Sequence, residues 1–209
     1  MQLYNANLSP NAFRVRVVAN ELGIELEIIE VDFRKGEHKS APFLAINPNG
    51  KVPVLVDGDF VLWESRAINA YLAALRPERG LYPADPQRRA TVDQWSYWQA
   101  VHLSPAMQRI VFERHLKPWF GMGETDEAAI EPQLKELAQF LPVLDANLAR
   151  KEWVAGDLSL ADFALGSTFI YRKPAGISLD AFPNVATLMT RLESRPSWQA
   201  AGPPVPSST

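Results

Sequence analysis

The stretch NPNGKVPVLVDGDFVLW, residues 47–63, decides the fold of the first half of the chain. Two runs rich in β-branched residues flank the dipeptide Asp57-Gly58, which favours the positive φ angles of a tight hairpin turn. Pro53 stands where the first run begins, a position at which the missing N–H group costs no ladder hydrogen bond. These features predict two antiparallel strands joined by a short turn.

Strands and helices alternate on both sides of this hairpin. A short apolar strand at Gln2 to Tyr4 precedes a predicted helix over residues 11–22, which Gly23 ends. A stretch with a period close to two predicts a second strand over residues 25–32. After the hairpin, apolar residues recur at helical spacing over residues 65–75. The predicted order is therefore strand, helix, strand, then strand, strand, helix.

Prolines mark the boundary between two domains. The segment RPERGLYPADPQ, residues 76–87, holds three prolines and a glycine, which interrupt helices. We place a linker at residues 78–86, between a first domain over 1–77 and a second over 87–209. The second domain has no strand pattern, and its amphipathic stretches predict an all-α helical bundle. The predicted helices cover about residues 88–117, 125–149, 159–172 and 184–195.

Composition limits the classes of function. The 209 residues contain no cysteine, which excludes disulfides, thiolate metal sites and a cysteine nucleophile. Twenty-one basic and twenty-four acidic residues leave no cationic excess for nucleic acid. Because there is no apolar run of about eighteen residues and no secretory leader, we expect a cytoplasmic protein without a membrane segment. The three histidines are too scattered for a metal site, so a small-molecule or protein partner is favoured.

Two positions around the hairpin could hold a ligand, and each has a plain structural alternative. A cis bond between Val52 and Pro53 would turn the backbone of Val52 outward to pair with an extended peptide, although only about 5–6% of X-Pro bonds are cis. At the next helix start, Ser65 as N-cap and the helix dipole favour an anion, and Glu64 favours an ammonium group. The alternatives are a trans proline, and a simple cap beside a solvated glutamate.

The start of the first helix offers a third position. The Ser9 hydroxyl at this helix N-terminus can donate a hydrogen bond to an anion. Ser9 or Asn11 can equally serve only as a helix cap. In the second domain, Ser159 and Asp162 form a capping-box pattern, which we interpret as structural.

One face of the first long helix carries an apolar stripe. Met107, Val111 and His115 recur at four-residue steps, and Phe112 lies beside them. Such a stripe is typical of a packed core, and the wall of a pocket is the alternative.

Residues 35–68, KGEHKSAPFLAINPNGKVPVLVDGDFVLWESRAI, closely resemble the glutathione-binding half of cytosolic glutathione transferases, the phi class in particular. The match combines the Val-Pro turn, a Glu-Ser pair eleven residues after that proline, and a His-Lys pair in the preceding loop. The segment AGDLSLADF, residues 155–163, extends the resemblance to the helical half. The resemblance implies an α+β thioredoxin-like N-terminal domain, an all-α helical-bundle C-terminal domain, and a homodimer with active sites at the domain junction.

The resemblance also implies roles for single residues in the first domain. Ser9 resembles the catalytic serine of the phi, theta and zeta classes, and Asn11 is the alternative partner of the thiolate. Glu64 and Ser65 would hold the γ-glutamyl end of glutathione. Val52, if the following proline is cis, would pair with the cysteinyl backbone.

The remaining roles concern the other end of glutathione and the second substrate. The glycyl carboxylate would meet His38, Lys39 and Lys51, the last of which replaces the glutamine common in the family. Asp93, on the first long helix, is a candidate to reach the glutathione of the neighbouring subunit. The electrophile would lie against the C-terminal helices. The candidates for this wall are Met107, Val111, Phe112 and His115.

The implied function is conjugation of glutathione to small hydrophobic electrophiles, a detoxification reaction, with peroxides as a second class of substrate. Glutathione is then the co-substrate, and no metal takes part. Two alternatives stay open: a non-catalytic glutathione-binding carrier or interaction protein, and a glutathione-dependent dehalogenase or isomerase. Because the chain has no cysteine, the reactive sulfur comes with glutathione, and the cysteine-using relatives of omega and beta type are excluded.

Overall fold

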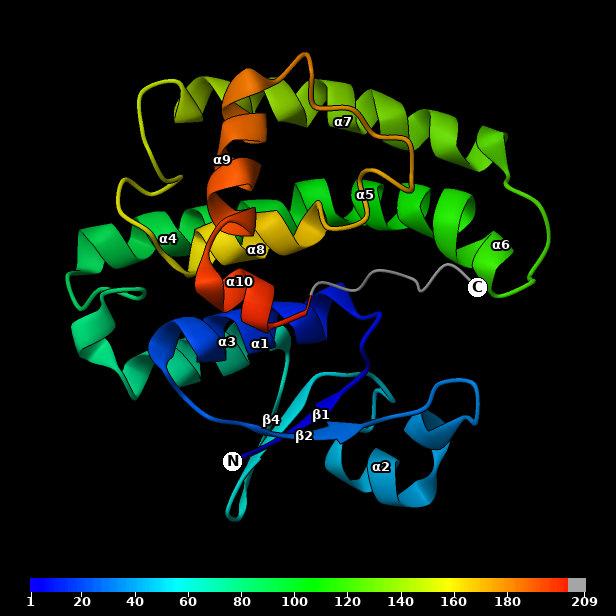
Figure 1. Ribbon diagram of the computed structural model, residues 1–209, viewed down its shortest axis with the longest axis vertical. Helices are drawn as coiled ribbons and strands as arrows, with labels where there is room; N and C mark the ends of the chain where they lie inside the picture. The colour runs from blue at the N-terminus through cyan, green and yellow to red at the C-terminus, as the bar shows by residue number, and fades with distance from the viewer. Residues whose placement is uncertain (203–209) are drawn as a thin grey trace. The chain divides into compact units, whose positions relative to one another are not determined.

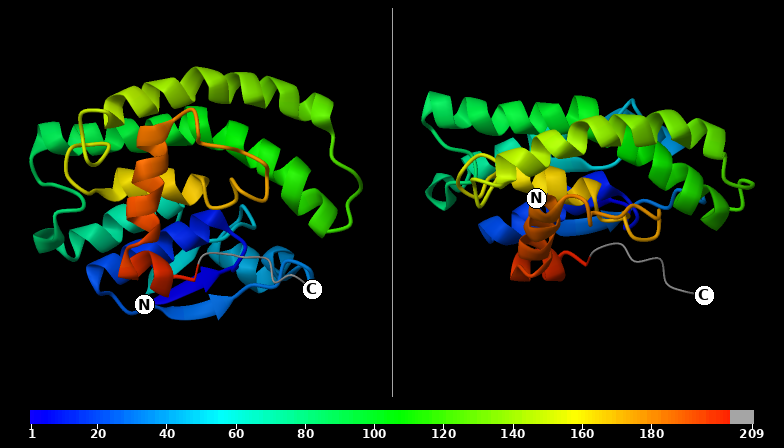
Figure 2. Two further views of the ribbon diagram at one scale, coloured as in Figure 1. Left: turned by 45° about the horizontal axis from the view of Figure 1, so that its top comes forward. Right: turned by 90° about the horizontal axis from the view of Figure 1, so that it is seen from above.

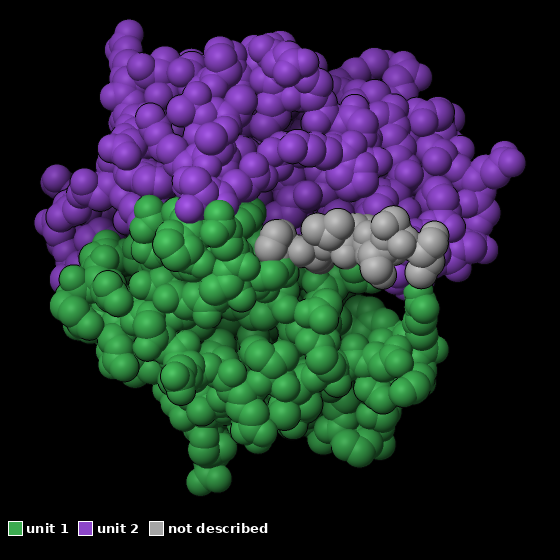
Figure 3. Space-filling view, in the orientation of Figure 1, with its two compact units in different colours: residues 1–82, 195–209 green, residues 83–194 purple. Residues whose placement is uncertain are grey.

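The computed structural model describes residues 1–202, and the chain forms two compact units (Figure 3). Of the described residues, the first unit contains Met1–Tyr82 and residues 195–202, and the second contains Pro83–Ser194. The boundary after Tyr82 falls inside the predicted linker, residues 78–86. No helix among the described residues combines the length and the apolar character that a membrane crossing needs.

A mixed four-stranded sheet forms the base of the first unit (Figure 1). Its strand order is β2-β1-β3-β4; β1 and β2 are parallel, and the other two pairs are antiparallel. The predicted hairpin is confirmed, because β3 and β4 pair on either side of the turn at Asp57-Gly58. The strands are β1 Gln2–Asn5, β2 Glu27–Glu30, β3 Val54–Asp57 and β4 Phe60–Trp63.

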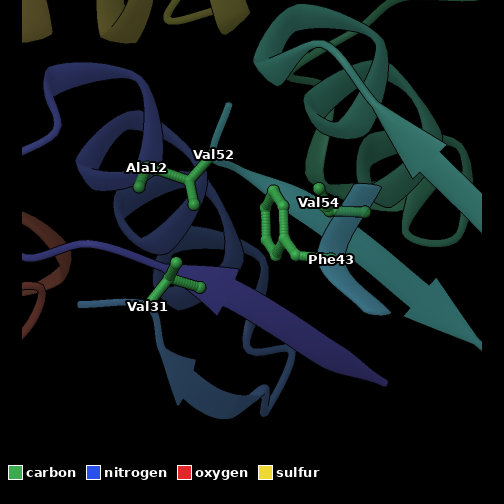
Figure 4. Packing of buried hydrophobic residues seen from close by; sticks show 5 residues of the cluster. All are labelled: Ala12, Val31, Phe43, Val52 and Val54. Atoms are coloured by element: carbon green, nitrogen blue, oxygen red, sulfur yellow. The ribbon is translucent and has the colours of Figure 1, made fainter. Parts of the chain in front are cut away.

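Helices cover both faces of this sheet (Figure 1). Helices α1 and α3 pack side by side. Neighbouring residues of a strand point to opposite faces, and the rings of Tyr4 and Phe43 lie 6.0 Å apart, so α2 covers the face opposite to that of Leu3. Figure 4 shows the small core that Phe43 completes, made of Ala12, Val31, Phe43, Val52 and Val54. The helical segments are α1 Pro10–Leu22, η1 Glu37–Lys39, α2 Ala41–Ile46, α3 Ser65–Ala74 and η2 Pro77–Arg79.

The last described helix, α10 Pro196–Ala200, packs on α1 in the first unit. The predicted domain over residues 87–209 therefore differs from the structure at its C-terminal end. Two contacts explain why α10 packs on the first unit. The ring centroid of Trp198 lies 4.8 Å from that of Phe13, and Arg195 Nε donates to Glu21 at 3.0 Å. Neither contact follows from the periodicity of the sequence, since both join residues far apart in the chain.

The helical unit begins with a long helical stretch in which two π-helical segments interrupt the α-helix. The sequence predicts one helix over about 88–117, whereas the structure has two π-helical segments within it. Pro105 and Pro118 have no N–H group, so the carbonyls four residues earlier, those of Val101 and Arg114, lack their α-helical donors. Val101 and Arg114 both lie inside the π-helical segments. The segments are α4 Pro86–Trp98, η3 Gln99–Leu103, α5 Ser104–Val111, η4 Phe112–Leu116 and α6 Lys117–Trp119.

Three further helices complete the all-α unit, whose prediction is confirmed. Helix α7 runs alongside α5 in both views of Figure 2. Asp145 of α7 accepts hydrogen bonds from the backbone N–H groups of Asn184 and Val185, at 2.8 and 3.1 Å, and so satisfies the first turn of α9. The helices are α7 Glu127–Leu148, α8 Leu160–Thr168 and α9 Pro183–Glu193.

The predicted capping box of α8 is confirmed. The Asp162 carboxylate accepts from the Ser159 N–H at 2.9 Å and from the Ser159 hydroxyl at 3.0 Å. It also accepts from the Val154 N–H at 2.8 Å, which the sequence pattern does not indicate. Burial raises the pKa of Asp162 to about 6, while these donors act in the opposite direction. The box therefore joins the start of α8 to the turn before it.

The contact between α10 and α1 should weaken in acid. Burial favours a higher pKa for Glu21, but hydrogen bonds from Arg195 and Ser197 outweigh it and lower the pKa. A carboxylate with a lowered folded-state pKa stabilises the protein above its unfolded pKa and loses that contribution as the pH falls through the folded value. We expect Glu21→Gln to reduce the free energy of unfolding by about 1–2 kcal/mol at pH 7 and by much less near pH 3.

Urea unfolding at the two pH values measures this difference, with the exposed acid change Glu25→Gln as the control. An equal effect of Glu21→Gln at both pH values would contradict the assigned ion pair.

Candidate active site

The N-terminus of α1 presents a serine hydroxyl. Ser9 is the N-cap, and its Oγ accepts a hydrogen bond from the Ala12 N–H at 3.2 Å. Because that bond uses an oxygen lone pair, the hydroxyl proton remains able to donate to a ligand. Asn11 is the second residue of α1, and its side chain is also partly exposed. The capping role and the ligand role of Ser9 are thus compatible.

The loop before β3 carries a cis peptide bond between Val52 and Pro53. Asn47, which is buried, fixes this loop: its Nδ2 donates to the Lys51 carbonyl at 2.6 Å, and its Oδ1 accepts from the Asn49 N–H at 3.1 Å. Within residues 1–202, no backbone hydrogen bond outside the regular elements involves Val52. An extended peptide can therefore pair with the Val52 backbone. Sequence reasoning missed Asn47, whose only signal was a position in a turn.

The start of α3 differs by one residue from the prediction. The N-cap is Glu64, and Ser65 is the first helical residue. Glu64 has a φ of 73°, which is unusual for a residue other than glycine, and its side chain is exposed and does not cap the helix. Outliers of this kind cluster at functional sites, because the surrounding structure must hold them. The free N–H groups of α3 and the Glu64 carboxylate thus lie at one corner of the unit.

Next to the start of α3 lies the buried guanidinium of Arg14, which sequence reasoning did not include among the site residues. Arg14 of α1 is 1% exposed, and its Nη1 donates to Ser65 Oγ at 3.0 Å. Burial lowers the pKa of the Arg14 guanidinium, and Arg66 lowers it further, whereas Glu64 raises it. The available signal was a charged residue among the apolar residues of α1, directly after Phe13.

Three basic residues follow the edge of the same unit. The His38 ring stacks on Phe33, with ring centroids 4.4 Å apart, and its Nδ1 has no hydrogen-bond partner within residues 1–202. The Lys39 ammonium lies over Gly50, 2.9 Å from the point that a Cβ there would occupy. Since Lys51 follows Gly50, the Lys39 ammonium at the end of η1 lies against the loop that carries Lys51. A carboxylate is the ligand that this edge favours.

The stripe on the first long helix is mostly interior. Met107 and Val111 are buried, which fits the core interpretation, whereas Phe112 and His115 are partly exposed. The π-helical segment η4 begins after Val111 and shifts the face that the following residues occupy. The His115 ring lies 5.3 Å from that of Tyr171, and its Nε2 has no partner in the described part of the chain. Burial lowers the pKa of His115, so its ring is neutral at pH 7.

The described residues contain no group of three side chains that could hold a metal ion. The site on the first unit instead offers hydroxyl, backbone, carboxylate and ammonium groups. It suits an extended peptide that carries an amine, carboxylates and a thiol.

Family models match both halves of the chain. The model of the glutathione S-transferase N-terminal domain matches residues 1–74, and that of the C-terminal domain matches residues 98–196. The chain is 39% identical over 202 residues to the probable glutathione S-transferase GSTF2 of Oryza sativa subsp. japonica, which covers 95% of this chain and 94% of the relative. The chain belongs to the glutathione S-transferase family. It is also 39% identical over 220 residues to glutathione S-transferase 3 of Zea mays, covering 100% of this chain and 98% of the relative.

A solved structure supports the same assignment. Glutathione S-transferase I from maize, in complex with an atrazine glutathione conjugate, matches with a TM-score of 0.87 and 36% identity, over 96% of this chain and 95% of that chain. The glutathione S-transferase described here is thus an enzyme that conjugates glutathione, its co-substrate, to electrophiles. The predicted thioredoxin-like domain followed by a helical domain is confirmed.

The space above Gly50 gives a test of the lysine edge in this transferase. A Cβ at Gly50 would lie 2.9 Å from Lys39 Nζ and 3.0 Å from the His38 carbonyl oxygen, so Gly50→Ala must displace both groups. We expect this change to weaken glutathione binding about tenfold, as the loss of one good contact to a charged group would.

Titration calorimetry with glutathione measures this effect. Gly58→Ala is the matched control, because Gly58 also has a positive φ, 60° against 62° at Gly50, but has nothing within 4 Å of its Cβ position. Equal losses of affinity in the two variants would show that backbone strain, and not the displaced lysine, is the cause.

Proposed function

We propose that the Ser9 hydroxyl donates a hydrogen bond to the glutathione thiolate and so activates the sulfur for attack. A free thiol has a pKa of about 8.5, and lowering it by two units requires about 2.7 kcal/mol of preferential thiolate stabilisation. A charge-assisted hydrogen bond contributes about 1.5–3 kcal/mol, and a helix N-terminus about 0.3–1 kcal/mol. The position of Ser9 as N-cap of α1 supports the proposal, since it supplies both contributions at one point.

The other ends of glutathione then find partners on the same unit. We assign the γ-glutamyl ammonium to the exposed carboxylate of Glu64 and the γ-glutamyl carboxylate to Ser65 and the free N–H groups of α3. The cysteinyl backbone pairs with Val52. The glycyl carboxylate is assigned to His38, Lys39 and Lys51. The charges of these groups complement those of the tripeptide, which supports the assignment.

We assign the contact with a small hydrophobic electrophile to the helical unit. Phe112 and His115 are partly exposed and offer an aromatic surface and one neutral imidazole. Met107 and Val111 then support these residues from the core, since both are buried. A neutral ring suits this role better than a charged one, because it keeps the contact surface weakly polar.

The Ser9 assignment makes a direct kinetic prediction. We expect Ser9→Ala to lower kcat/KM for a chloronitrobenzene by at least about tenfold at pH 7, since it removes one charge-assisted hydrogen bond from the thiolate. Asn11→Ala, two residues after Ser9, should lower kcat/KM by less than about threefold.

The rate of conjugation is followed by absorbance at saturating glutathione, with the electrophile varied below its KM. An unchanged rate for Ser9→Ala together with a lost rate for Asn11→Ala would transfer the role to Asn11. No conjugation by the unmodified protein with any electrophile, despite tight glutathione binding, would favour the carrier.

We further propose that the protein is a homodimer. Tyr97 and Val101 are each 65% exposed and lie four residues apart, on one face of the α4–η3 stretch. On the first unit, Phe60 and Trp63 of the edge strand β4 are 47% and 40% exposed. Neighbouring exposed apolar side chains on one helix face, such as Tyr97 and Val101, are typical of interfaces between subunits. Asp93 precedes Tyr97 by one helical turn, so the same face would bring it to the partner.

A charge on this face should separate the subunits. We expect Val101→Asp to convert the dimer to a monomer at micromolar concentration, because it places an unpaired carboxylate in an apolar interface. Sedimentation equilibrium measures the mass of the particle. Met122→Asp makes the same kind of change at a residue that is 59% exposed in the loop after α6, and should leave the dimer intact. A monomeric unmodified protein would contradict the proposal.

We also propose a cytoplasmic location. The reaction consumes the reduced thiol of glutathione, and the cytosolic redox poise keeps thiols reduced.

A further inference from the structure

We propose that Arg14 is a positioning residue for glutathione: its buried guanidinium fixes the Ser65 hydroxyl as a donor toward the γ-glutamyl carboxylate. This inference rests on the function proposed above, in which Ser65 contacts that carboxylate. Nothing in the family match assigns this role to Arg14.

The argument starts from the hydrogen-bonding capacity of a hydroxyl. Ser65 Oγ can accept two hydrogen bonds and donate one. Arg14 Nη1 donates to it at 3.0 Å, and a guanidinium has donors only, so this bond has a fixed direction. The Ser65 proton cannot point at Arg14, and it stays available to an acceptor elsewhere. A carboxylate is such an acceptor, whereas an ammonium group is not.

Burial makes this arrangement rigid. Arg14 is 1% exposed and Ser65 is 4% exposed, so water does not compete freely for the bond between them. Truncation of one partner in such a buried pair leaves the other partner without its bond. A lysine retains the charge but lacks the planar fork of donors, so it does not hold the same geometry.

The place of Arg14 in α1 gives the bond a second consequence. Arg14 follows Ser9 by five residues, about 7.5 Å along the helix axis at 1.5 Å per residue. The bond to Ser65 therefore ties the helix that presents the thiolate partner to the helix that presents the carboxylate partner. It sets the distance between the two ends of the glutathione site.

A pair of ligands isolates this role from general stability. Glutathione is compared with 4-aminobutyrylcysteinylglycine, which lacks only the α-carboxylate of the γ-glutamyl residue. The unmodified protein should bind glutathione more tightly than this analogue. In Arg14→Gln, the ratio of the Kd of the analogue to the Kd of glutathione should fall about tenfold. The variant loses the contact with the γ-glutamyl carboxylate, and the analogue has no such carboxylate to lose.

Two further variants serve as controls. Arg16→Gln removes the same charge from the same helix, but the Arg16 Nη1 donates to Asn7 Oδ1 at 2.7 Å, and the ratio should stay unchanged. In a Ser65→Ala background, Arg14→Gln should lower the ratio no further, since Arg14 acts through Ser65. If Arg14→Gln does not fold by circular dichroism, Arg14→Lys replaces it, with an expected fall of severalfold.

The outcomes separate the positioning role of Arg14 from the assignment of the γ-glutamyl carboxylate to Ser65. Titration calorimetry that shows equal weakening of both ligands in the Arg14 variant, or an unchanged ratio, would overturn the positioning role and leave the assigned site intact. An unmodified protein that binds both ligands equally would show that Ser65 does not hold the carboxylate, and both claims would then fail.

Discussion

A hydrogen bond from a buried guanidinium to a buried hydroxyl, Arg14 to Ser65, joins the two helices to which the proposed glutathione site is assigned. Helices α1 and α3 come from distant parts of the first unit's sequence, and the residues assigned to glutathione stand at the N-termini of both helices. The bond and the apolar packing around it keep these two helix N-termini together. This contact and the packing of α1 against α3 together hold the Ser9 cap and the Glu64 turn in place.

The remaining parts of the site have short-range causes. Asn47 holds the loop before β3: it donates one bond to the Lys51 carbonyl and accepts two from Asn49, and so it fixes the loop that carries Val52. Gly50 has no side chain, which leaves room for the Lys39 ammonium against its backbone. The chain thus arranges a hydroxyl, an exposed peptide unit and two charged edges on a single compact unit. In the proposed function, this arrangement orients a flexible tripeptide before any reaction takes place.

Much of this fold follows from the sequence because the signals are local. The hairpin at Asp57-Gly58, the end of α1 at Gly23 and the capping box at Ser159 each depend on residues close together in the chain. The family resemblance then predicted the domain pair and the positions of Ser9 and Glu64. Local patterns carry this information because turn and cap geometry requires particular side chains.

The features that the sequence did not reveal depend on distant contacts or on small shifts of register. The return of α10 rests on Trp198 against Phe13, some 185 positions earlier in the chain. Periodicity cannot distinguish an α-helix from one with two π-helical segments, because each adds a single residue to a turn. The capping position of Glu64 depends on the exit from β4, and the burial of Arg14 depends on its contact with Ser65, 51 residues later in the chain.

The central claim is that this protein stabilises the thiolate of bound glutathione through Ser9. The most direct measurement is the pKa of the glutathione thiol in the complex, obtained from the ultraviolet absorbance of the thiolate as a function of pH. The account predicts a pKa clearly below the free value of about 8.5 in the unmodified protein, and a value close to the free one in Ser9→Ala. An unshifted thiol pKa in the unmodified complex, or a lowered one that survives Ser9→Ala, would contradict it.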